Sequence, residues 1–115
     1  MRSALLVFVG GALGTLARYG VAEGLQLDAT WPWPTFLVNL TGSLALGLLV
    51  ARVNDPADPR RLLLGTGVLG GYTTYSAFAV EVAEADVSLA VAYALASVVL
   101  GTVAAAAGLT LGRRR

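Results

Sequence analysis

Residues 70–78 read Gly-Gly-Tyr-Thr-Thr-Tyr-Ser-Ala-Phe, and they lie near the middle of an apolar run long enough to cross a membrane. Two adjacent glycines lower helix propensity by about 2 kcal/mol, and the β-branched Thr73 and Thr74 lower it further. Lipid offers no water to unpaired backbone groups, so irregular backbone at membrane depth occurs only where protein or a polar path surrounds it. The stretch therefore predicts a helix interrupted at Gly70-Gly71, with a binding site beside the interruption.

The composition of the whole chain is that of a polytopic membrane protein. Of its 115 residues, 57% are apolar and only 13% are charged, whereas soluble domains carry about 25% charged residues. The charges fall mainly between four apolar stretches, which predict membrane-spanning helices at about residues 3–22, 35–51, 62–80 and 87–111. We expect a single all-α domain over residues 1–115, and we interpret the first stretch as a span rather than a cleaved signal peptide.

Several classes of chemistry are excluded by what the chain lacks. It contains no cysteine and no histidine, which excludes thiolate chemistry and histidine bases or metal ligands. A net charge of +1 argues against a nucleic-acid partner. No arrangement of a nucleophile with a base occurs, so we do not expect an enzyme.

Arginines are distributed unevenly between the two ends of the predicted spans. The loops at one end, residues 23–34 and 81–86, contain no basic residue but several acidic ones, among them Asp28. The other end carries Arg2, Arg52, Arg60, Arg61, Arg113, Arg114 and Arg115. Because cytoplasmic loops hold the excess of positive residues, we expect both termini on the cytoplasmic side of the cell (plasma) membrane.

Small and polar residues repeat along the predicted second and fourth spans. The second-span stripe, at intervals of four residues, consists of Thr35, Asn39, Ser43 and Gly47. Tyr93 and Ser97 are likewise four apart in the fourth span. Residues at this spacing share one helix face. Both interhelical hydrogen bonding and an ion path account for such stripes, and the pattern alone leaves the two readings open.

Glycines at intervals of four residues predict close contact between helices. Gly10 and Gly14 have this spacing in the first span, as do Gly67 and Gly71 in the third. Residues 65–70 also match the dinucleotide-binding pattern G-x-G-x-x-G, but no predicted strand precedes them. We therefore interpret these glycines as packing residues.

The polar groups within the predicted spans are mostly hydrogen-bond donors. Arg18 lies one turn beyond Gly14, and although it could extend to the membrane interface, we expect a structural or electrostatic role inside the protein. Carboxylates are missing from the spans except for Glu81 near an end. Donors of this kind suit a small anion, while backbone carbonyls freed at the interruption could hold a cation.

Three motifs, in order and over nearly the whole chain, resemble the CrcB/Fluc family of fluoride channels. They are Gly10-Gly11-Ala12-Leu13-Gly14 with Arg18-Tyr19, then Thr35-Phe36-Leu37-Val38-Asn39 with Gly42-Ser43 and Gly47, then residues 70–78 with Glu81. The resemblance implies an antiparallel dimer of four-helix subunits, with two fluoride pores that export cytoplasmic fluoride passively. It also implies a structural sodium ion (Na⁺) at the dimer interface, held by the backbone carbonyls of Gly70 and Thr73.

The resemblance implies roles for individual side chains as well. Asn39 is similar to the pore asparagine, and Phe78 to one of two phenylalanines whose ring edges face fluoride. Tyr93 and Ser97 resemble a track of hydroxyl groups on the fourth helix, and Arg18 the arginine of the first helix. We assign the fluoride path to Asn39, Ser43, Thr74, Tyr75, Phe78, Tyr93 and Ser97, and structural roles to Arg18 and Glu81.

Two features depart from the usual pattern of that family. Tyr75 stands where phenylalanine is usual, and its hydroxyl beside the path keeps a non-conducting partner subunit as an alternative function. Homodimeric members insert in both orientations, whereas the arginine asymmetry of this chain fits a single one. We therefore expect a heterodimer with a paralogous, oppositely oriented subunit.

A further alternative, a small multidrug-type transporter, would need a carboxylate in the first span, where this chain has only Arg18.

Overall fold

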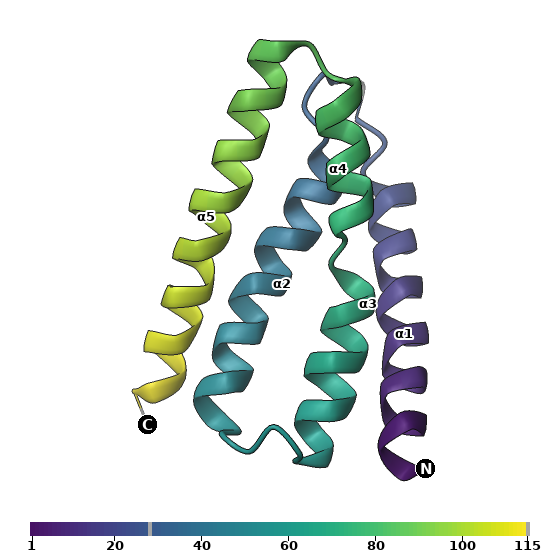
Figure 1. The fold of residues 1–115 in the computed structure, drawn as a ribbon, viewed down its shortest axis with the longest axis vertical. Coiled ribbons are helices and arrows are strands. Elements are labelled where there is room, and N and C mark those ends of the chain that lie inside the picture. The colour runs from purple at the N-terminus through teal and green to yellow at the C-terminus, as the bar shows by residue number, and fades with distance from the viewer. Residues whose placement is uncertain (28, 115) are drawn as a thin grey trace.

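The chain runs back and forth between the two ends of an elongated molecule (Figure 1). The structure is a computed structural model that describes residues 1–27 and 29–114, so the predicted loop residue Asp28 and the terminal Arg115 lie outside it. In chain order the helices are α1 (Arg2–Gly24), α2 (Trp33–Arg52), the π-helix η1 (Arg61–Leu69), α3 (Gly70–Tyr72), α4 (Tyr75–Glu84) and α5 (Val87–Arg113). Regular structure in the described residues is entirely helical, as the sequence predicts.

Three of the helices are long and apolar enough to cross a membrane: α1, α2 and α5. They contain the predicted spans 3–22, 35–51 and 87–111 and extend at most two residues beyond either end of each. The longest dimension of the molecule, 43 Å, is close to the roughly 40–45 Å of a bilayer with its headgroups. The predicted span 62–80 is divided among η1, α3 and α4, each shorter than a membrane crossing requires.

Large apolar side chains cover the outside of the molecule, and its buried core is small. The buried apolar side chains are Phe36, Val38, Val53 and Tyr93. Leu5, Phe8 and Leu16 on α1, by contrast, are exposed over 62%, 74% and 66% of their surface. An apolar exterior of this extent suits lipid rather than water. The chain is therefore an integral membrane protein.

Glycines allow two pairs of helices to pack with their backbones close together. α1 packs on η1 and α3, and α2 packs on α5. A methyl group on Gly14 would collide with the carbonyl of Val68, and one on Gly47 with the carbonyl of Ala105. A methyl group on Gly10 would collide with the carbonyl of Leu63 and lie 2.9 Å from the Cα of Gly67. The predicted packing role of Gly10, Gly14 and Gly67 is confirmed.

The irregular backbone between α3 and α4 lies at the threonines and not at the glycines. Gly70 is helical (φ −63°, ψ −36°), whereas Thr73 (φ −78°, ψ 157°) and Thr74 (φ −146°, ψ 124°) are extended. The expectation of an interruption at Gly70-Gly71 is wrong in position. Gly71 meets the backbone of Gly11, where a side chain would not fit, so Gly71 serves helix packing.

Alanine at Gly14 is expected to destabilise the protein, whereas alanine at Gly20 of the same helix is not. The new methyl group at position 14 would press on the backbone of η1 and α3, whereas nothing lies within 4 Å of the methyl group at position 20. Alanine also favours a helix over glycine by about 1 kcal/mol, so Gly20→Ala should leave the melting temperature unchanged or raise it. Thermal unfolding of the detergent-solubilised protein measures both variants. Equal melting temperatures for the two would contradict the packing role of Gly14.

Candidate functional site

A groove of about 440 Å³ runs between α2, the junction of α3 and α4, and α5. We call it the polar groove, and its lining residues are Asn39, Gly42, Ser43, Leu46, Gly65, Leu69, Gly70, Thr73, Thr74, Tyr75, Phe78, Ser97 and Val98. All the residues predicted for a fluoride path lie here except Tyr93. Gly70 and Thr73, the predicted sodium ligands, line the same groove.

The side chain of Asn39 holds the extended backbone of Thr74 from across the groove. Its Nδ2 donates to the Thr74 carbonyl at 2.9 Å, and its Oδ1 accepts from the Thr74 N–H at 2.8 Å. An amide group has two N–H donors. The second N–H of Asn39 makes no hydrogen bond to any residue that the structure describes, so one donor of this amide remains available at the groove.

Carbonyl groups at the junction lose their helical donors, and those of Gly70 and Thr73 are two of them. In a continuous α-helix the N–H of Thr74 would bond Gly70, and the N–H of Ala77 would bond Thr73. Here the Thr74 N–H goes to Asn39, and the Ala77 N–H goes to the Thr74 Oγ1 at 3.2 Å. Within residues 1–27 and 29–114 no other donor replaces them. Carbonyl oxygens are suitable ligands for a hard cation, so this pair fits a sodium ion chemically.

The carbonyl of Gly71, which follows Gly70 in the chain, accepts hydrogen bonds from side chains of α1. Arg18 Nε donates to it at 3.1 Å, and Thr15 Oγ1 approaches it at 3.5 Å. Tyr75, which would supply the donor in a continuous helix, begins α4 instead. Arg18 therefore contacts backbone inside the protein and joins α1 to the α3–α4 junction.

The hydroxyl of Tyr93 does not reach the polar groove. Tyr93 is 1% exposed, and its OH donates to Glu81 Oε2 at 2.7 Å. The other oxygen of Glu81 accepts from Thr35 Oγ1 at 2.6 Å, so the carboxylate ties α2, α4 and α5 together. The hydroxyl track of Tyr93 and Ser97 stays a prediction, because Ser97 lines the groove and Tyr93 lies outside its lining. The ring of Tyr93 packs 5.2 Å from that of Phe78, measured between centroids.

The remaining side chains of the groove differ in what they can donate. Ser97 Oγ is buried and has no hydrogen-bond partner among the described residues. Ser43 Oγ donates to the Asn39 carbonyl at 2.8 Å, so its proton is already engaged within α2. Tyr75 is 80% exposed, and its ring centroid lies 6.0 Å from that of Phe78. The groove is therefore lined by the Asn39 amide, with one N–H to spare, by Ser97 and by two aromatic rings.

Comparison with known protein families matches residues 5–109 to the family described as CrcB-like protein, Camphor Resistance (CrcB). The chain belongs to the CrcB family. The resemblance on which the predicted roles rest is thereby confirmed at the level of the family. Because the match covers nearly the whole chain, every residue that lines the polar groove falls within it.

Relatives of this chain in the CrcB family are named as ion channels. Fluoride-specific ion channel FluC of Caulobacter sp. (strain K31) is 46% identical over 99% of this chain and 97% of its own length. The protein of the same name from Beijerinckia indica is 47% identical over 98% of both chains. Fluoride-specific ion channel FluC 2 of Nitrobacter hamburgensis is 43% identical over 95% of both. These names denote channels and not enzymes, as expected for this chain.

Some residues of the site have partners that sequence spacing did not indicate. Thr35 was recognised only as part of a polar stripe, and its bond to Glu81 spans 46 residues of chain. The apolar side chains of Leu46, Leu69 and Val98 complete the groove, and nothing in their sequence context distinguishes them from lipid-facing leucines and valines. The polar stripe of α2 thus indicates which face of the helix contacts the rest of the protein, but not the residues to which its side chains bond.

Alanine at Asn39 is expected to destabilise the protein more than alanine at Ser43 does. Asn39→Ala leaves the N–H and the C=O of Thr74 without partners, and Thr74 is only 9% exposed; each unpaired group costs about 1–3 kcal/mol. Ser43→Ala removes a hydroxyl that bonds its own helix, which should cost less than about 1 kcal/mol. Unfolding in a denaturing-detergent titration measures both variants. A loss at Asn39 no larger than that at Ser43 would contradict the bridging role.

Proposed function

We propose that this chain is a subunit of a fluoride-selective channel that allows passive export of cytoplasmic fluoride across the cell membrane. The polar groove supports this function because it brings donors and aromatic rings together in a chain of the CrcB family. The carrying observation is the second N–H of Asn39, which lines the groove and has no partner in the described part of the chain. A donor of this kind at membrane depth is costly unless a ligand supplies an acceptor.

The chemistry of the groove suits a small, strongly hydrated anion. A permeating ion must exchange its water for groups that the protein supplies. The Ser97 hydroxyl and the second Asn39 N–H are donors, and the edges of the Phe78 and Tyr75 rings carry weak positive charge. None of the acidic residues that the structure describes lines the groove, so a fluoride ion would meet none of these carboxylates there.

The proposed assembly is an antiparallel dimer in which η1, α3 and α4 together form a fourth, discontinuous span. Its support is that the groove is incomplete in one copy, since Tyr75 beside it is 80% exposed. A second subunit would cover this side. The freed carbonyls of Gly70 and Thr73, together with the same pair from the partner, would hold a structural sodium ion between the subunits.

We propose further that the partner is a paralogous subunit of opposite orientation. The support is the arginine asymmetry, because Arg2, Arg52 and Arg113 lie at the same end of the molecule as both termini (Figure 1). By the positive-inside rule this end is cytoplasmic. Accessibility of single cysteines at positions 2 and 84 in whole cells is expected to show one orientation. Equal populations of both orientations for this chain alone would contradict the paired-subunit proposal.

Fluoride should leave proteoliposomes that contain this chain together with an oppositely oriented partner, and chloride should not. A fluoride electrode records efflux after the potassium gradient is released with valinomycin. The chain alone should give little or no efflux if it needs a partner. Absence of fluoride efflux in both preparations would reject the channel function.

A second candidate function, that of a non-conducting partner subunit, is favoured by one observation. Tyr75 places a hydroxyl-bearing ring on the groove at a position 80% exposed. Tyr75→Phe, measured in the same efflux assay, separates the two functions. A conducting subunit should retain its fluoride efflux to within a few fold in this variant. Efflux that appears only after the substitution would support the non-conducting function of the natural chain.

A further inference from the structure

A second groove, of about 460 Å³, lies between α2 and η1 at the arginine-rich end of the molecule. We call it the terminal groove. Its floor is apolar and consists of Ala45, Leu48, Leu49, Leu64, Val68 and Leu69. Along α2 the lining extends from Ala45 to Arg52, about 10 Å at 1.5 Å per residue. This length is a large part of one leaflet, which is about half of the roughly 30 Å hydrocarbon core.

Two arginines, one from each side, line the mouth of the terminal groove: Arg52 at the end of α2 and Arg60 just before η1. Arg52 is exposed and makes no ion pair or hydrogen bond with the described residues. The side chain of Arg60 is 69% exposed. It donates through Nε and Nη2 to Asp58, which leaves Nη1 without a partner in the part of the chain that the structure describes.

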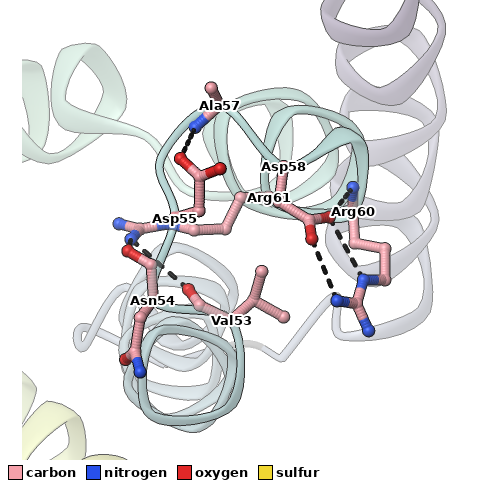
Figure 2. A network of polar contacts seen from close by, with 7 residues as sticks. All are labelled: Val53, Asn54, Asp55, Ala57, Asp58, Arg60 and Arg61. Atoms are coloured by element: carbon pink, nitrogen blue, oxygen red, sulfur yellow. Dashed lines mark hydrogen bonds and ion pairs between the residues drawn. The ribbon is translucent and has the colours of Figure 1, made fainter.

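The loop between α2 and η1 holds Arg60 at the mouth (Figure 2). Asp58 accepts from the backbone N–H of Arg60 at 2.7 Å as well as from its side chain, and these bonds keep the pKa of Asp58 below its usual value. Arg61 donates to the carbonyls of Asn54 and Val53 at 3.2 and 3.5 Å. The loop therefore joins the two helix ends through its own contacts, and Figure 2 shows the remaining nitrogen of Arg60 pointing away from Asp58.

We propose that the terminal groove binds an anionic phospholipid. One acyl chain lies along the apolar floor, and the phosphate lies between Arg52 and Arg60. A groove that is apolar along the membrane depth and cationic at its end matches both parts of such a lipid, whereas free phosphate would leave the floor unused. This proposal is independent of ion conduction and does not rest on the proposed function.

Native mass spectrometry of the purified full-length protein tests the proposal with dioleoylphosphatidylglycerol and dioleoylphosphatidylcholine, whose acyl chains are the same. The wild-type protein should retain the anionic lipid in preference. Arg52→Gln and Arg60→Gln should each weaken its retention about fivefold, as expected for loss of one arginine near a membrane surface. Arg2→Gln, at the same end but outside the groove, should have little effect. Equal retention of the two lipids, or an equal loss in Arg2→Gln, would overturn the proposal.

Asp58→Asn separates the charge of Arg60 from the structure of the loop. It weakens the ion pair and leaves Arg60 freer to bind phosphate, so retention of the anionic lipid should be unchanged or stronger. A loss as large as that of Arg60→Gln would mean that loop structure, and not charge, determines binding, and would overturn the proposal. Soluble glycerophosphoglycerol should not compete with the lipid; full competition would identify a site for free phosphate groups only.

Photocrosslinking distinguishes the lipid from a second copy of the chain as the occupant. Leu64 lines the terminal groove, and benzoylphenylalanine in its place should crosslink to phosphatidylglycerol in proteoliposomes. Mass spectrometry identifies the crosslinked molecule, because a lipid adds its own mass to that of the chain, whereas a second subunit adds the mass of a protein. Crosslinking mainly to another protein chain would show that a second subunit covers this groove, and would overturn the proposal.

Discussion

The pairing of the Asn39 amide with the backbone of Thr74 is the interaction on which the geometry of the candidate site depends. An extended residue between two helical segments leaves a donor and an acceptor unpaired, and lipid cannot satisfy either. Asn39 satisfies both, with bonds of 2.9 and 2.8 Å. An amide can do this because it holds a donor and an acceptor on two separate atoms; an ionised carboxylate at the same place could accept from the N–H but could not donate to the carbonyl.

The same pairing decides which carbonyls of the junction become available. By accepting the Thr74 N–H, Asn39 removes the donor of Gly70, and by accepting the Ala77 N–H, the Thr74 side chain removes the donor of Thr73. The carbonyl of Gly71 between them is bonded by Arg18 from α1. Neighbouring carbonyls therefore differ: those of Gly70 and Thr73 lack donors among the described residues, whereas that of Gly71 is bonded by side chains of α1.

The elements that were predictable from the sequence are those that depend on local spacing or on lipid. Span positions follow from apolar length, and the glycine contacts follow from intervals of four residues. The position of the irregular backbone did not follow, because Gly71 is helical to suit its contact with Gly11, and Thr74 is extended because of Asn39, 35 residues away. Tyr93 shares a helix stripe with Ser97, yet its hydroxyl goes to Glu81. Neither outcome is encoded in a local pattern.

Polar groups that have hydrogen-bond partners and polar groups that lack them lie in different parts of the molecule. Where α1 meets η1 and where α2 meets α5, glycines bring helices together through apolar and backbone contacts that need no further partner. Around the polar groove, by contrast, the Ser97 hydroxyl and the Gly70 and Thr73 carbonyls lack partners among the described residues. Polar groups in this state are expensive against lipid. In the proposed channel, the groups that would contact an ion are therefore among those that one copy of the chain leaves without partners, so assembly and ion binding would draw on the same atoms.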